Sequence, residues 1–282
     1  MDLLTFVFVA FAGAVAAGAF GALLGLGGGI IVIPVLTLLL GVDIRYAIGA
    51  SVIAVIATSS GAAATYVRDG LTNRRLGLFL AVAATIGAAT GAFVAGIIAG
   101  QALYLVFALV LILSALLMSR RRYSELTPEL PNHPWSERLG LAGSYHGIAE
   151  GQPVRYNVAG VPLAFGVVYF AGILSGLLGI GGGVIQVPAM DTLMRLPIKV
   201  ASATSNFMLG ITAVTSAGIY FSRGDVVPIV AAPVVLGVLV GAQVGTRLMV
   251  RLGGAAIRGA LVVLLVVIAL QMAAKGLGLH IA

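Results

Sequence analysis

Long apolar runs separated by short polar breaks fill most of the chain. A helix needs about 20 residues to cross a hydrocarbon core, and most of the runs approach or reach that length. Two of them, Ile30–Leu40 and Val184–Met194, are only about half as long and predict half-helices. The predicted segments are Leu3–Leu24, Ile30–Leu40, Tyr46–Val67, Leu76–Ile98, Leu103–Met118, Val161–Leu178, Val184–Met194, Val200–Phe221, Val226–Leu248 and Ile257–Ala274.

The apolar pattern occurs twice, at a constant offset of 154 residues. The run Gly27–Gly29, followed by Pro34, corresponds to Gly181–Gly183, followed by Pro188. Further matched pairs are Ala47 and Ala201, Ser51 and Ser205, Thr58 and Thr212, and Tyr66 and Tyr220. This agreement indicates a tandem duplication, as in many transporters. It predicts a first transmembrane repeat at 1–118, a cytoplasmic linker at 119–160 and a second transmembrane repeat at 161–282.

The positions of Lys and Arg predict how the repeats are oriented, because cytoplasmic loops retain an excess of positive residues. Suppose that the linker is cytoplasmic and that each Gly-broken pair of segments enters and leaves on one side. Then only Arg45, Arg223 and Lys275 of the 16 basic residues lie outside. If each Gly-broken pair instead crossed the membrane once, six basic residues would lie outside. We therefore expect two inverted repeats of five segments, with both termini non-cytoplasmic. The count of basic residues on each side is the same whether both segments of a Gly-broken pair cross the membrane fully or form a re-entrant hairpin.

Composition excludes a soluble protein. Hydrophobic residues make up 60% of the chain and charged residues only 9%, against about 25% charged in soluble domains. The formal charge of +7 is explained by the basic loops, so nucleic acid is not an expected partner. The chain has no cysteine, and its histidines, His133, His146 and His280, lie in the linker and the tail. No catalytic residue, metal site or cofactor is predicted, and the chain is not expected to be an enzyme.

The glycine triplets are the strongest candidates for a binding site. Each triplet breaks a helix and is followed by a short helix, whose first N–H groups lack internal partners and carry partial positive charge. Such an end suits an anion, and glycine lets the ligand approach the backbone. Helix packing is the alternative role for these glycines. The predicted substrate-binding residues are Gly27, Gly28, Gly29, Ser51, Thr58, Gly181, Gly182, Gly183, Gln186, Ser205, Asn206 and Thr212.

The remaining members of this set are neutral donors and acceptors. Ser51 and Thr58 are two helical turns apart on one face, and the second repeat has the same spacing. Bonding of these hydroxyls within the helices is the alternative. Gln186 and Asn206 occur only in the second repeat and predict an asymmetric site. No charged residue lies deep in an apolar segment, which argues against a buried carboxylate relay.

The doubled pattern AGxxxxLLG[LI]GGG[IV]IxxP resembles the TauE/SafE family of sulfite and organosulfur-anion permeases. The resemblance implies a secondary transporter in a bacterial inner membrane, carrying sulfite, thiosulfate, an organosulfonate or a related small anion by alternating access. A passive channel for small inorganic anions is the alternative function. The expected partners are the anionic substrate and the lipid bilayer, and no oligomeric state is predicted.

Overall fold

The computed structural model describes residues 2–119, 134–146, 153–251 and 254–278. Every predicted apolar segment is helical, and Leu3–Leu24 and Val161–Leu178 have the predicted bounds. The elements are α1 (Leu3–Leu24), α2 (Gly29–Pro34), the π-helix η1 (Val35–Leu39), α3 (Ile44–Arg68), α4 (Arg74–Ala95), α5 (Gly100–Ser119), α6 (Pro134–Leu139), β1 (Gly143–His146), β2 (Pro153–Tyr156), α7 (Val161–Leu178), α8 (Gly183–Thr192), α9 (Ile198–Ser222), α10 (Pro228–Arg251) and α11 (Gly254–Gly276).

Both half-helices fold back along the helix that precedes them. In the first repeat, Gly28 faces Gly21 of α1, and Val35 lies against Gly13. In the second repeat, the backbone N–H of Ala159, just before α7, donates to the carbonyl of Met194, just after α8. Each Gly-broken pair therefore enters and leaves at the same end of the bundle.

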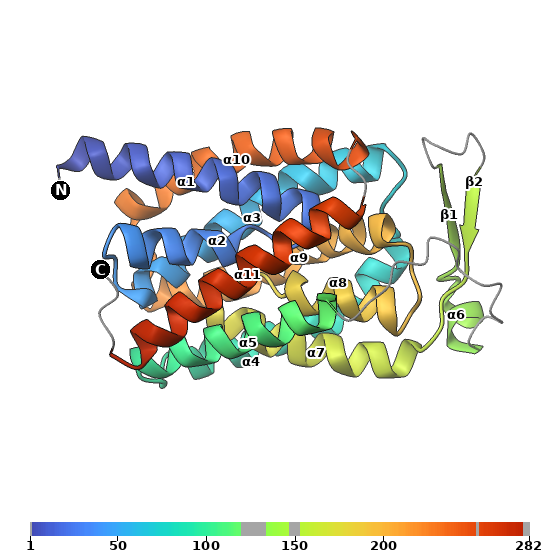
Figure 1. Ribbon diagram of the computed structural model, residues 1–282. Helices are drawn as coiled ribbons and strands as arrows, with labels where there is room; N and C mark the ends of the chain where they lie inside the picture. Colours follow the sequence, from blue (N-terminus) through green and yellow to red (C-terminus); the bar gives the residue numbers. More distant parts are fainter. Residues whose placement is uncertain (1, 120–133, 147–152, 252–253, 279–282) are drawn as a thin grey trace.

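Close helix pairs join the two repeats. The helix α1 packs against α10, and α4 packs against α7 (Figure 1). Glycines at these contacts face backbone carbonyls of the partner helix; Gly241 lies against Val15 and Gly91 against Ile173. Small residues permit this close approach between helices. The helices α3 and α9 contact each other between these two pairs.

Part of the linker is attached to one end of the bundle. The strands β1 and β2 pair antiparallel, with Gly143 opposite Tyr156. Asn73, at the start of α4, donates from its side-chain amide to the carbonyl of Leu141 at 2.7 Å and to the hydroxyl of Tyr156 at 3.1 Å. The described part of the linker is thus held by side-chain hydrogen bonds. Arg120, Arg121, Arg122 and His133 lie outside the described residues.

The surface of the bundle is apolar, as a bilayer requires. Five of the described helices, α1, α3, α4, α7 and α10, are long and apolar enough to cross a membrane. Large apolar side chains such as Leu4, Phe93 and Phe221 are more than half exposed. Water would not stabilise such a surface, whereas lipid tails solvate it. The fold is therefore an all-α, multi-pass membrane protein.

Candidate functional site

The glycine breaks have the backbone conformation that only glycine adopts easily. Gly25, Gly27 and Gly28 have φ values of 72°, 76° and 76°. The equivalent Gly179, Gly181 and Gly182 have values of 64°, 85° and 71°. A side chain is disfavoured at positive φ, so these positions explain why both motifs are rich in glycine. Gly28 and Gly182 are the N-caps of α2 and α8, and neither helix has a side-chain cap.

The two glycine breaks contact each other at the centre of the bundle. A Cβ at Gly29 would lie 2.7 Å from the carbonyl oxygen of Gly179, and one at Gly183 would clash with the carbonyl oxygen of Gly25. The breaks of the two repeats are therefore in backbone contact. The sequence identified both triplets, and the structure brings them to one place.

Two serine hydroxyls link the repeats at this contact. Ser51 of α3 donates to the carbonyl of Gly179 at 2.8 Å, and Ser205 of α9 donates to the carbonyl of Gly25 at 2.9 Å. Each serine thus bonds to the glycine break of the other repeat. Because these carbonyls end a helix, the helical ladder supplies no partner for them.

The second repeat carries two buried amides with unused hydrogen-bonding groups. Gln186 and Asn206 have no exposed surface, and no partner in the described part of the chain reaches Gln186 Nε2 or Asn206 Oδ1. Gln186 Nε2 lies 3.0 Å from where a Cβ on Gly182 would stand, so this donor faces the N-terminus of α8. An unpartnered buried amide costs about 1–3 kcal/mol.

The other amide atoms are engaged. Gln186 Oε1 accepts from the Ser205 hydroxyl at 3.4 Å. The Asn206 amide donates to the carbonyls of Ala22 at 2.9 Å and Ser202 at 3.2 Å. In the first repeat the equivalent positions are Val32 and Val52, so the polar centre is asymmetric.

The predicted threonines donate their hydroxyls to their own helices. Thr58 donates to the carbonyl of Ala54, and Thr212 donates to the carbonyls of Met208 and Leu209. Thr58 Oγ1 also lies 3.6 Å from where a Cβ on Gly28 would stand, so its free lone pair is close to the first glycine break. No described contact joins the Thr212 hydroxyl to the second break.

Two tyrosines near the breaks were given no role from the sequence. The Tyr66 hydroxyl donates to the carbonyl of Ala22, and the Tyr220 hydroxyl donates to the carbonyls of Gly176 and Leu177. These carbonyls belong to the last turns of α1 and α7, just before the breaks. The matched positions of the tyrosines in the two repeats were the available signal, because a buried phenol requires a partner.

The broken helices and the duplication agree with a comparison against known families. The sequence profile described as sulfite exporter TauE/SafE matches residues 10–272. The chain belongs to the TauE/SafE family. The match extends over both repeats, so the resemblance predicted from the glycine motifs is confirmed.

Curated proteins that are similar to this chain are named as probable membrane transporters. A probable membrane transporter protein, YunE, from Bacillus subtilis is 29% identical over 93% of this chain and 95% of its own length. A probable membrane transporter protein from Xylella fastidiosa is 29% identical over 81% of this chain and 79% of its own. A probable membrane transporter protein from a Sinorhizobium species is 28% identical over 96% of this chain and 93% of its own length. No solved structure matches the chain.

Proposed function

We propose that this protein is a secondary transporter of a small anion, such as sulfite, thiosulfate or an organosulfonate. The family and the names of the relatives support transport across a membrane. The buried contact between the two glycine breaks supports a carrier that works by alternating access. A passive channel needs an open path, and here the backbones of Gly25 and Gly183 are in contact.

The observation that carries the anion assignment is the donor group at the start of α8. In this ten-residue helix the N–H groups of Ile185 and Gln186 donate to the carbonyl of the N-cap Gly182, whereas the N–H groups that precede them lie outside the helical ladder, at the positive end of the helix dipole. Gln186 Nε2 faces the same place and is buried without a partner. These are neutral donors, which stabilise an oxyanion without a fixed positive charge. The proposed site joins Gly181–Gly183 and Gln186 to Ser205, Asn206 and the first break.

We also propose that the repeats have inverted topology in a bacterial inner membrane. The helix α1 begins at the end of the bundle opposite to the linker, whereas α7 begins beside the linker (Figure 1). The helix α11 ends at the same end of the bundle as that at which α1 begins, on the opposite side of the bundle (Figure 1). With the linker cytoplasmic, both termini are non-cytoplasmic and the positive-inside rule is satisfied.

The Gln186→Met variant tests the site. Methionine keeps the length of the side chain and removes an unsatisfied buried amide, so the free energy of unfolding is expected to stay the same or rise. A hydrogen bond to a charged ligand is worth about 1.5–3 kcal/mol, so the affinity for the anion is expected to fall roughly ten- to 150-fold. Affinities of purified protein are measured for sulfite, sulfate, thiosulfate, taurine and sulfoacetate.

The control for this variant is Ile185→Met, a nearly volume-conserving change at the next residue. Equal affinities in Gln186→Met, Ile185→Met and the unchanged protein would remove Gln186 from the site. Reconstituted vesicles then separate the two functions: saturable uptake with counterflow supports a carrier, and unsaturable current supports a channel.

A further inference from the structure

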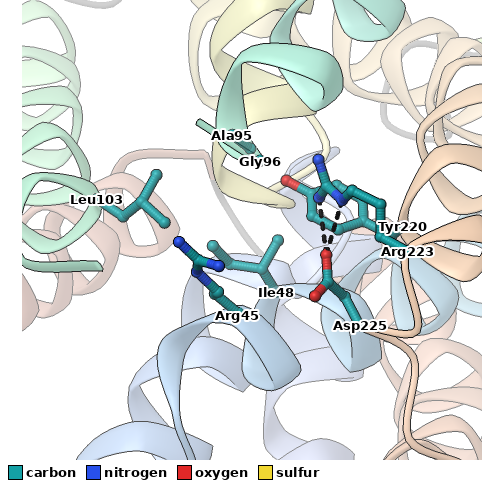
Figure 2. A pocket seen from close by; sticks show the side chains of 8 residues that line it. All are labelled: Arg45, Ile48, Ala95, Gly96, Leu103, Tyr220, Arg223 and Asp225. Atoms are coloured by element: carbon teal, nitrogen blue, oxygen red, sulfur yellow. Dashed lines mark hydrogen bonds and ion pairs between the residues drawn. The ribbon is translucent and has the colours of Figure 1, made fainter. Parts of the chain in front are cut away.

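A polar pocket of about 200 Å³ is formed where α3 begins and where α4 and α9 end. These helix ends lie at the end of the bundle opposite to the linker (Figure 1). At about 30 Å³ per water in the liquid, it has the volume of roughly six waters, enough for a small oxyanion. Its lining includes Arg45 and Ile48 of α3, Leu103 of α5, and Tyr220, Arg223 and Asp225 at the end of α9 (Figure 2).

One of the two pocket arginines is fixed by the protein. Arg223 Nε and Nη2 each lie 2.9 Å from Asp225 Oδ2, and Nη1 donates to the carbonyl of Ala92 at 2.6 Å. The guanidinium also stacks 4.5 Å from the centre of the Tyr220 ring. Because Asp225 balances its charge, Arg223 forms a rigid, nearly neutral wall.

The other arginine has unused donors. Arg45 lies across the pocket from Arg223 (Figure 2). Its guanidinium donates to the carbonyl of Ile98 at 3.3 Å, and no carboxylate of the described residues is within ion-pair distance. A guanidinium has five N–H donors, so most of those of Arg45 have no acceptor within the part of the chain that the structure describes. The pocket therefore has a net positive charge at Arg45.

The floor of the pocket contacts the second glycine break. A Cβ on Gly179 would lie 2.8 Å from Ile48 Cγ2, and the Tyr220 hydroxyl donates to the carbonyl of Gly176 at 2.8 Å. Ser51, one turn after Ile48, bonds to the carbonyl of Gly179. Ile48 and Tyr220 thus link the pocket to the last turn of α7 and to the break that follows it.

We propose that this pocket is an anion-binding vestibule in which Arg45 binds a small oxyanion before it reaches the glycine breaks. A guanidinium pairs with two oxygens of a sulfur oxyanion at once, which a point charge cannot do. The inference rests on the function proposed above, because the vestibule supplies the central site. It also gives Arg45 a role at an end where the positive-inside rule disfavours basic residues.

The Leu103→Cys variant reports on the vestibule, because the chain has no other cysteine. In detergent, where both ends of the bundle are accessible, its labelling rate is measured with an anionic sulfonatoethyl and a cationic trimethylammonioethyl methanethiosulfonate. Adding Arg45→Gln is expected to lower the ratio of anionic to cationic rates on the order of tenfold. Sulfate is expected to slow labelling with Arg45 and not with Arg45→Gln, relative to gluconate at equal ionic strength.

Lys275→Gln is the matched control, because it removes a positive charge at the same end without lining the pocket. It is expected to change the ratio by less than about threefold, since salt screens distant charges. A cysteine that reacts with neither reagent, or a ratio that Arg45→Gln leaves unchanged, overturns the proposal. The affinity of Gln186→Met for the anion tests the central site independently of the labelling experiment. A wrong proposal for the vestibule can therefore be distinguished from a wrong proposal for the central site.

Discussion

Single hydrogen bonds hold the two glycine breaks together. Ser51 and Ser205 each donate to a carbonyl of the other repeat, at positions where the helix no longer supplies a partner. Both serines are fully buried, so water does not replace either bond. Any movement that separates the two glycine breaks must therefore break the hydrogen bonds of both Ser51 and Ser205.

Replacing Ser51 with alanine leaves the carbonyl of Gly179 buried without a donor. A lost partner of this kind costs about 1–3 kcal/mol, so Ser51→Ala is expected to lower the free energy of unfolding by that amount. The measurement is unfolding of the purified protein in detergent.

Thr58→Val is the comparison for Ser51→Ala. It also removes a buried hydroxyl, but the carbonyl of Ala54 that accepts from Thr58 keeps its helical N–H partner. We expect its stability to change by less than about 0.5 kcal/mol, because the replacement has nearly the same shape. If the two variants lose stability equally, the bond between the repeats has no special role.

At the scale of whole elements, glycine has a second role that differs from that in the breaks. Gly237, Gly241 and Gly245 recur every fourth residue of α10 and face the carbonyls of Phe11, Val15 and Ala19 of α1. They lie in a helix and serve packing, whereas Gly27, Gly28, Gly181 and Gly182 lie between two helices at positive φ. Helix packing, the alternative role considered for the triplets, thus occurs at these three glycines of α10.

The Gly241→Ala variant is expected to weaken the pairing of α1 with α10, because the added methyl clashes with the carbonyl of Val15. Overpacking of this kind typically costs about 1–3 kcal/mol. Gly218→Ala in α9 is the control, since nothing lies within 4 Å of the added methyl. Thermal unfolding in detergent should give a lower midpoint for Gly241→Ala alone; equal midpoints would contradict the packing role.

The helices could be predicted almost completely from the apolar pattern, and the remaining elements could not. The bilayer selects long apolar runs, so α1 and α7 follow from hydropathy alone. Hydropathy does not reveal hydrogen-bond registry, so the division of Ile30–Leu40 into α2 and the π-helix η1 after Pro34 was not foreseen. The strands β1 and β2 form in a polar segment that lacked a clear pattern.

The sequence pointed to most of the residues that meet at the glycine breaks, but not to their contacts; it missed Tyr66 and Tyr220, and the described hydrogen bonds of Thr212 lie within its own helix. The duplication identified the triplets, the serines and the asymmetric Gln186. It could not show that each serine bonds to the opposite repeat, because such a contact depends on how the repeats pack. The pocket at Arg45 was missed for the same reason, since its lining residues come from four helices and two loops that are distant in the sequence.

At the scale of the whole molecule, contacts in one repeat have counterparts in the other. The pairs α1 with α10 and α4 with α7 correspond under the 154-residue offset, as do the bonds of Tyr66 and Tyr220. The centre departs from this pattern, because Gln186 and Asn206 replace the valines of the first repeat. A symmetric scaffold of helices thus surrounds an asymmetric polar centre.

Cysteine accessibility in intact cells tests the orientation of the molecule in its membrane. Ser144→Cys is at an exposed position in β1, beside the linker end, and Gln101→Cys is at an exposed position in the first turn of α5, at the opposite end. Because basic residues are retained in the cytoplasm, a membrane-impermeant maleimide should label Gln101→Cys in intact cells and Ser144→Cys only after permeabilisation. Neither change removes a charge, so the topology itself is undisturbed. The reverse labelling would place the linker outside, and the pocket at Arg45 would then open to the cytoplasm.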